Sequence, residues 1–345
     1  MRSHLAKKSQ HIKRLENGFH FFNNSYYLSH QRFIILLLFL ILSAAVKLSA
    51  QQKCLKHEIF FKTDNDVYLG LGLDRYYTQG FLLGLTKAIN THSKKNWIKK
   101  TASFSIGQEI YTPYVAYSEV KEDVDRPFAG YLYVSSALNW FTKAEEVFSA
   151  EVQVGIIGPH ALGEEVQAGW HKTFGFYEVR GWQFQLNNAF QVNLNAGYKK
   201  TFFRNRQGNF DFIGNGIIRA GTRQTSGEVA GLLRLGRLNP ISTSAVSAAR
   251  VDTRQSPIPK ELYLYVRPYL SVVAYDATIE GGLFVQQHGE AVSGKINAVI
   301  AGGTMGFVYA SRRWMLTFSA TCTTKDTKGM YYFPVWGSAS LGFRF

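Results

Sequence analysis

The chain has 345 residues, a formal net charge of +15 and a hydrophobic content of 46%. The stretch after residue 50 contains no apolar run of the ~20 residues that a membrane-spanning helix needs, so this stretch is not expected to cross a membrane as helices. The basic charge favours anionic partners. Because the chain lacks a basic aromatic module, it is not expected to bind nucleic acid.

The first fifty residues have the pattern of a secretory signal. Basic residues precede an apolar run at 33–46, and the run ends in the small-residue sequence Leu48-Ser49-Ala50. This pattern predicts a signal peptide at 1–50, cleaved near Ala50, with an uncleaved anchor as the alternative. Removing these residues, which hold seven Lys or Arg and one Glu, leaves a net charge of +9. Lipopolysaccharide phosphates are a natural anionic partner for such an exported chain.

The remaining residues, 51–345, alternate apolar and polar side chains with period two. Val192 and Leu194 are separated by an asparagine, and Leu262 and Leu264 are separated by a tyrosine. Alternate side chains of a strand face opposite sides of a sheet, so one set can contact lipid and the other a lumen. Strands of ~10 residues with their turns divide this stretch into roughly twelve.

We therefore predict an all-β fold with one domain, a transmembrane antiparallel β-barrel of the bacterial outer-membrane type. The alternating last strand ends on Phe345, which resembles the end of bacterial outer-membrane barrels that the barrel-assembly machinery reads. Aromatic residues such as Tyr131 and Tyr133 suit the girdles at the two membrane interfaces. A large soluble β-sandwich is the alternative. The two cysteines, Cys54 and Cys322, could form a disulfide in an exported compartment, but the sequence does not supply the geometry.

Polar clusters at 63–66, 74–78 and 167–171 interrupt the strand pattern. They supply carboxylates, a hydroxyl, an amide and an imidazole, the groups that a metal-assisted hydrolase needs. His171 is the best candidate base because the unperturbed pKa of histidine lies near neutrality. Residues 163–174 are expected to form a short helix, which would place Gln167 and His171 on one face at positions i and i+4.

Four blocks of the sequence, taken together and in order, resemble the outer-membrane lipid A 3'-O-deacylase family (LpxR-like). They lie at 61–66, 74–80, 125–130 and 155–171. The resemblance implies a twelve-stranded barrel and calcium-dependent hydrolysis of the 3'-linked acyloxyacyl ester of lipid A. It places the site at the outer-leaflet side of the barrel. It also implies lipopolysaccharide as substrate, the outer membrane as location and a monomer.

The resemblance assigns roles to individual residues. It implies a catalytic set and a set of Ca²⁺ ligands, because calcium prefers oxygen ligands and can stabilise an oxyanion. The catalytic set is His171, Gln167, Thr78 and Asp64, and the metal set is Asp64, Thr63, Asn65 and Glu178. Thr63 stands where the family usually has Asn, and Tyr177 stands where it has a carboxylate, so Glu178 is the nearest replacement.

Substrate phosphates would need basic side chains near this site. Arg75, Arg126 and Lys121 are the candidates, since Ser118 occupies the position where the family has a basic residue. The sequence has no nucleophile elbow, which favours direct attack by water, while Thr78 and Ser135-Ser136 leave a covalent acyl-enzyme open. The rival to an enzyme is a non-catalytic barrel that serves as a pore, an adhesin or a structural element.

Overall fold

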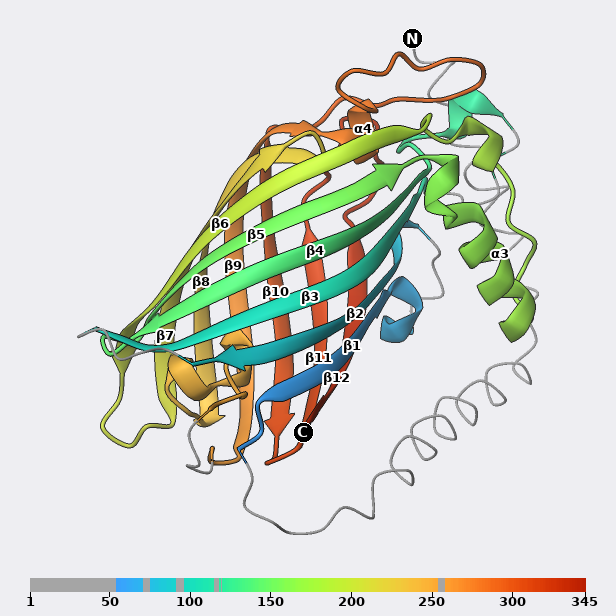
Figure 1. Ribbon diagram of the computed structural model, residues 1–345. Coiled ribbons are helices and arrows are strands. Elements are labelled where there is room, and N and C mark those ends of the chain that lie inside the picture. Colours follow the sequence, from blue (N-terminus) through green and yellow to red (C-terminus); the bar gives the residue numbers. More distant parts are fainter. Residues whose placement is uncertain (1–53, 71–74, 91–95, 115–117, 119, 254–257) are drawn as a thin grey trace. The chain divides into compact units, whose positions relative to one another are not determined.

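The fold is a closed antiparallel β-barrel in a computed structural model that describes residues 54–70, 75–90, 96–114, 118, 120–253 and 258–345 (Figure 1). The predicted signal peptide lies outside these residues. Twelve strands occur in the described part, and each pairs with its neighbours in chain order until β1 pairs with β12. The strands are β1 (His57–Asn65), β2 (Tyr76–Ile89), β3 (Trp97–Thr112), β4 (Ala129–Thr142), β5 (Glu146–Ile157), β6 (Ala189–Arg204), β7 (Phe210–Gly221), β8 (Gln224–Arg237), β9 (Glu261–Asp276), β10 (Val299–Ala310), β11 (Trp314–Thr323) and β12 (Val335–Arg344). The predicted fold class is confirmed.

The outer wall of the barrel is apolar. In β6, Val192 and Leu194 are exposed, whereas the alternating residues Gln191 and Asn193 are buried. In β9 the exposed side chains include Leu262 and, at every second position after it, Leu264 and Val266. Side chains that alternate in this way give a barrel a lipid-facing exterior and a polar interior. Within the described residues, no helix combines the length and the apolarity of a membrane span.

The short helices divide between the two ends of the barrel. The chain termini of the barrel meet at one end, where the backbone of His57 is hydrogen-bonded to that of Phe345; we name it the terminal end and the opposite one the loop end. The loop end carries η2 (Asp66–Leu69), η3 (Lys121–Asp123), η4 (Pro159–Ala161), α3 (Gly163–Phe174), η5 (Trp182–Phe184) and α4 (Ala277–Glu280), and the segment between β8 and β9 carries η6 (Ile241–Thr243) and η7 (Ala245–Ser247).

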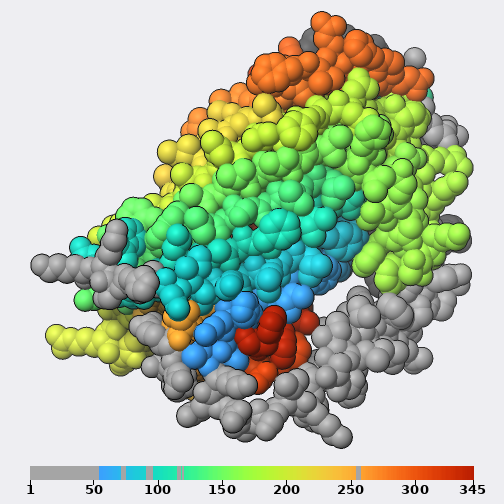
Figure 2. Space-filling model, viewed as in Figure 1, coloured from blue at the N-terminus to red at the C-terminus, as the bar shows by residue number. Residues whose placement is uncertain are grey.

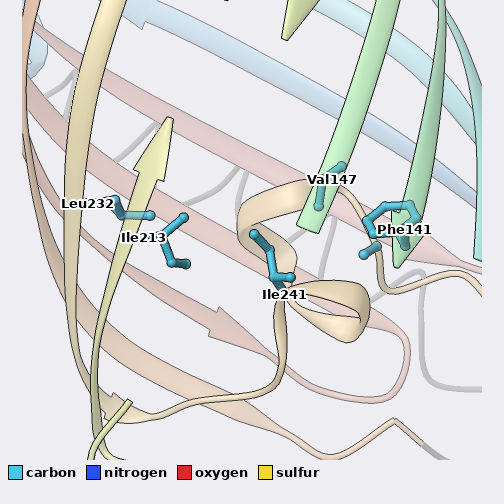
Figure 3. Close-up of a cluster of buried hydrophobic side chains, with 6 residues drawn as sticks. Phe141, Val147, Ile213, Leu232 and Ile241 are labelled. Carbon is cyan, nitrogen blue, oxygen red and sulfur yellow. The ribbon is translucent and has the colours of Figure 1, made fainter. Parts of the chain in front are cut away.

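The segment between β8 and β9 folds into the terminal end of the lumen. Ile241 and Ala249 of this segment are fully buried against inward-facing side chains of four strands (Figure 3). These strand residues are Phe141, Val147, Ile213 and Leu232. Lys99 of β3 donates hydrogen bonds to the backbone carbonyls of Ser242 and Ala249, which ties the segment to the opposite wall. An apolar plug therefore fills this end of the barrel.

One expectation from the sequence is wrong, and one open question is answered. Tyr131 does not lie in an interfacial girdle, because it is 1% exposed and stacks on Tyr133, with the Arg223 guanidinium 5.1 Å from its ring centre. Alternation alone cannot tell an inward aromatic residue from an outward one near a strand end. Cys54 and Cys322 are both free thiols, so the disulfide does not form.

Candidate active site

Helix α3 lies against the outer wall of the barrel. Its buried residues are Gly163, Gln167 and His171, which recur every fourth position and form one stripe facing the strands. The ring of Trp170 contacts that of Phe81 on β2, with 5.9 Å between ring centroids. Figure 2 shows the light-green atoms of α3 beside the cyan and blue atoms of the first strands. The predicted helix is confirmed, and it buries the predicted pair of polar residues.

The close approach of α3 to the wall depends on glycine. A Cβ atom on Gly163 would lie 2.7 Å from the ring of Trp182 and 3.1 Å from the Cα of Gly130 in β4. Such distances are too short for carbon atoms, so any other residue would push the helix away. Just before the helix, the side-chain amide of Gln108 in β3 donates a 2.7 Å hydrogen bond to the carbonyl of Ala161. The first turn of α3 is thus fixed to β3 and β4.

The backbone after α3 sets the tautomer of His171. The helix ends at Gly175, whose φ of +71° lies in the left-handed region, and the Phe176 amide donates to the His171 carbonyl at 2.9 Å. This reversal brings the carbonyl of Tyr177 within 2.8 Å of His171 Nδ1. A carbonyl oxygen can only accept, so the proton is assigned to Nδ1 and the basic lone pair to Nε2. A backbone carbonyl here does the orienting work expected of a carboxylate.

Gln167 is held in place by a hydrogen bond from Trp182. The indole Nε1 of Trp182 donates a 2.8 Å hydrogen bond to Gln167 Oε1, and both side chains are buried at 1% exposure. Trp182 also belongs to an apolar cluster with Ile110, Phe128 and Phe184. This cluster anchors α3 to the wall and fixes which end of the Gln167 amide is the donor. Gln167 is therefore positioned rigidly one turn from His171.

A β-bulge places two adjacent polar residues of β2 on the outer wall. The register with β3 shifts between Tyr77 and Gln79, so Thr78 is the extra residue. Tyr77 faces the lumen, where its hydroxyl donates to Asp64 Oδ2 at 2.8 Å. Thr78 Oγ1 is 2.5 Å from Thr112 Oγ1, and Gln79 pairs with Ile110, a member of the Trp182 cluster. Thr78 and Gln79 thus lie on the same wall as α3.

The predicted calcium ligands do not converge. Asp64 faces the lumen and accepts hydrogen bonds from Lys62 and Tyr77, whereas Thr63 faces outward and contacts the hydroxyl of Tyr68 at 3.0 Å. Alternation along β1 separates these neighbours onto opposite faces. The Glu178 side chain is 77% exposed and forms an ion pair with Arg180 at 3.0 Å. Of the four predicted ligands, Asn65 alone pairs with Gln79, the neighbour of Thr78 on the outer wall.

Oxygen donors do gather where β1 ends. Asn65 Oδ1 caps η2 by accepting from the Val67 amide at 2.8 Å, and the adjacent Asp66 is buried. Asp66 Oδ2 accepts from the Arg75 amide at 2.7 Å, which ties η2 to the start of β2 just before Thr78. One carboxylate with neutral oxygens is the chemistry that calcium accepts. In the described part of the chain, no three His, Cys, Asp or Glu side chains are grouped to hold a metal.

The three predicted phosphate-binding residues differ in access. Arg75 is half-buried, with its guanidinium 4.8 Å from the ring centre of Tyr332, and Lys121 is exposed at the start of η3. Arg126 is 1% exposed and donates to Asp326 at 3.2 Å and to Thr278 at 3.2 Å. Burial raises the pKa of the Asp326 carboxyl, and the Arg126 guanidinium opposes that shift. Arg126 therefore joins loops rather than presenting its charge outward.

The sequence alone did not point to four parts of this arrangement. They are Gln79, Thr112, Trp182 and the backbone carbonyl of Tyr177. Thr112 could have been found, because it shares the parity of Gln108 and Ile110 along β3 and therefore faces the same wall. Gln79 could have been found in the same way, because it shares the parity of the exposed Leu83 and Leu85 along β2. Trp182 and the Tyr177 carbonyl depend on loop packing, for which the sequence carries no periodic signal.

A closed twelve-stranded barrel with an apolar outer wall defines this chain as an integral outer-membrane protein. A helix packed on that wall around a buried histidine sets it apart from a plain barrel. A family model described as "Outer membrane protein LpxR" matches residues 34–345. The chain belongs to the LpxR family.

One solved structure shows the same fold. LpxR from Salmonella typhimurium is 19% identical, with a TM-score of 0.68 over 84% of this chain and 100% of that chain. The translocator domain of the autotransporter NalP from Neisseria meningitidis is 10% identical, with a TM-score of 0.39 over 92% of this chain and 97% of that one. A search of curated proteins found no match.

Proposed function

We propose that the protein is a lipid A deacylase of the outer membrane. Its reaction would be the calcium-dependent hydrolysis of the 3'-linked acyloxyacyl ester of lipid A. The observation that carries the proposal is the position of His171, which is 6% exposed between α3 and the outer wall of the barrel. A base at that wall would meet the acyl chains of lipopolysaccharide in the outer leaflet. Membership of the LpxR family supports the same substrate.

An apolar path leads from the lipid-facing wall to this histidine. Phe61 of β1 is 42% exposed and stacks on Phe81 of β2, with 6.3 Å between centroids. Phe81 in turn contacts Trp170, the neighbour of His171 on α3. An acyl chain that follows these three rings would keep its apolar surface covered while its ester approaches the base. The path therefore favours a lipid ester over a soluble one.

The residues support direct attack by water. His171 Nε2 would remove a proton from a water molecule as that water attacks the ester carbonyl carbon, while the Tyr177 carbonyl stabilises the resulting imidazolium through Nδ1. His171 would then return the proton to the departing alcohol oxygen. Gln167 would orient the water or the ester from the adjacent turn. Thr78 shares its hydroxyl hydrogen bond with Thr112, so an acyl-enzyme on Thr78 is not favoured.

Calcium, when bound, would polarise the ester carbonyl as a Lewis acid. The Asp66 carboxylate, with the side-chain oxygens of Asn65 and Thr78, is the donor set that we propose to hold it. This set replaces the predicted Asp64, Thr63 and Glu178, whose side chains face the lumen, Tyr68 and solvent respectively. Asp64 would instead support the site indirectly, by anchoring Tyr77 beside the bulge.

The loop end offers cations to the phosphates of lipid A. Arg75 and Lys121 would supply them, because Arg75 adjoins the proposed calcium ligands and Lys121 is exposed. Arg126 is excluded from direct contact by its burial. We further propose that the protein is a monomer, inserted by the barrel-assembly machinery after signal-peptide cleavage near Ala50.

A pore is the less favoured function. The apolar plug around Ile241 fills the terminal end of the lumen, and inward-facing charges such as Arg234 and Asp211 are paired at 2.6 Å. A conducting channel needs an open polar path, and this arrangement opposes one. Single-channel recordings on the refolded protein are therefore expected to show no steady conductance.

The test is mass spectrometry of lipid A after incubation with refolded protein. Wild-type protein with calcium should remove the mass of one acyloxyacyl group, and a chelator should abolish this loss. His171→Ala, checked for a folded barrel by its gel mobility without heating, should leave lipid A intact. An unchanged mass with folded wild-type protein, across lipid A types of different acylation, would refute the proposed activity.

A further inference from the structure

The side chain of Gln79 is buried without a hydrogen bond. It is 1% exposed, and its Nε2 atom has no hydrogen-bond partner among the described residues. A buried amide N–H that lacks a partner loses its hydration without compensation, so native structures rarely keep one. Such a group is explained when a ligand accepts its hydrogen bond.

The position of Gln79 indicates which ligand. Gln79 faces the outer wall, because it shares the parity of the exposed Leu83 along β2 and because the next residue, Gly80, pairs with the lumen-facing Asp64. On this wall Gln79 pairs with Ile110, which packs in the cluster of Trp182. Trp182 is hydrogen-bonded to Gln167 of α3. The amide therefore lies at the wall that α3 covers, on the strand of Thr78 and near the helix that carries His171.

We propose that Gln79 is a further catalytic residue, whose Nε2–H donates a hydrogen bond to the carbonyl oxygen of the scissile ester. The inference rests on the proposed deacylation. As the water oxygen bonds to the carbonyl carbon, its proton passes to His171 Nε2 and the π electrons of the carbonyl move onto that oxygen. Gln79 stabilises the oxyanion, which then reforms the carbonyl and expels the alcohol oxygen, protonated by His171. The amide is neutral and preorganised by burial, so it favours the charged intermediate over the uncharged ester.

Two substitutions of similar length remove the donor. Gln79→Met replaces the amide with an apolar chain, and Gln79→Glu replaces the N–H by an oxygen that repels an oxyanion. We expect kcat on lipid A to fall by roughly 10²- to 10³-fold, the usual loss for one oxyanion donor, with KM changed by less than about threefold. Gln79→Met should fold at least as stably as wild type, since no hydrogen bond is lost.

Gln191→Met is the matched control. Gln191 is also a fully buried glutamine of a strand, but its Nε2 donates to the Ala189 carbonyl and it lies on β6, away from α3. This variant should keep wild-type kcat per folded molecule. A long-chain alkyl phosphonate monoester, which mimics the tetrahedral oxyanion, adds a binding readout. Gln79→Met should weaken its binding at least tenfold more than that of intact lipid A, a difference that a packing role for Gln79 would not produce.

The outcomes separate the inference from the function on which it rests. Wild-type kcat in a folded Gln79→Met or Gln79→Glu protein would overturn the role of Gln79 and leave deacylation standing. Equal losses of phosphonate and lipid A affinity would overturn it as well. A wild-type protein that hydrolyses no lipid A would refute the proposed function and the inference with it. A selective loss of kcat and of phosphonate affinity would establish Gln79 as an oxyanion donor.

Discussion

The inner and outer walls of the barrel both bury polar side chains, but they do so with different chemistry. Inside, charges are paired: Arg234 contacts Asp211 at 2.6 Å and Arg223 contacts Asp276 at 2.8 Å. Outside, near α3, several of the buried polar groups are uncharged amides and hydroxyls, which include Gln167, Gln79 and Thr78. Paired charges hold strands together, whereas neutral donors and acceptors retain capacity for a substrate. Changes to the two walls should therefore separate stability from activity.

The largest expected effect comes from the inner wall. Asp211 is fully buried and accepts hydrogen bonds from Arg234 and Arg204. Asp211→Ala would leave the buried Arg234 guanidinium with only the more distant Glu261 carboxylate, at 3.8 Å, as counter-charge, at a cost of about 3–5 kcal/mol in the free energy of unfolding. Urea unfolding in detergent micelles measures this loss. Deacylation per folded molecule should stay at the wild-type level, and its loss in folded Asp211→Ala would contradict the separation of the two walls.

The anchor of α3 gives the next effect. Trp182→Phe keeps an aromatic ring against Phe128 but removes the hydrogen bond to Gln167 Oε1. A buried oxygen without its donor costs about 1–3 kcal/mol, and the loosened Gln167 should lower kcat. Lipid A turnover and thermal unfolding measure the two effects. Trp140→Phe, on β4 away from α3, is the control and should change neither; equal turnover in both variants would argue against the anchor.

The turn after α3 should be more sensitive than an equivalent turn elsewhere. Gly175 and Gly208 have φ values of +71° and +68°, and a Cβ on either would meet nothing within 4 Å. Alanine at either site should therefore cost about 1–2 kcal/mol of backbone strain alone. Gly175→Ala should also lower kcat, because it shifts the Tyr177 carbonyl that orients His171. Gly208→Ala, in the turn after β6, should not. Similar turnover in the two variants would contradict the role of this carbonyl.

The smallest expected effect concerns the apolar path. Phe81→Ala removes the ring that links Phe61 to Trp170. The lost apolar contact with the acyl chain, worth about 1 kcal/mol, should raise KM for lipid A roughly fivefold. The value of kcat should change little. Initial rates over a range of lipid A concentrations in mixed micelles measure this. Phe104→Ala, also on the lipid-facing wall, serves as control. If both variants raise KM equally, general membrane contact rather than a path explains the effect.

The sequence by itself determined the barrel and the helix. Alternation of residues such as Leu262 and Tyr263 encodes which side chains face lipid, because a strand turns successive side chains to opposite faces. Gln167 and His171 are four residues apart, and side chains at this spacing lie on one face of a helix. Both features repeat within a few residues and do not depend on distant parts of the chain.

Only the tertiary structure decided how the site is assembled. The bulge at Thr78 arises from the register between β2 and β3, and it places Thr78 on the outer wall beside Gln79 while Tyr77 meets Asp64 on the inner one. The Tyr177 carbonyl, rather than Glu178, reaches His171 because Gly175 reverses the chain. Strand register and loop packing depend on contacts between residues far apart in the sequence, so no local pattern could have specified them.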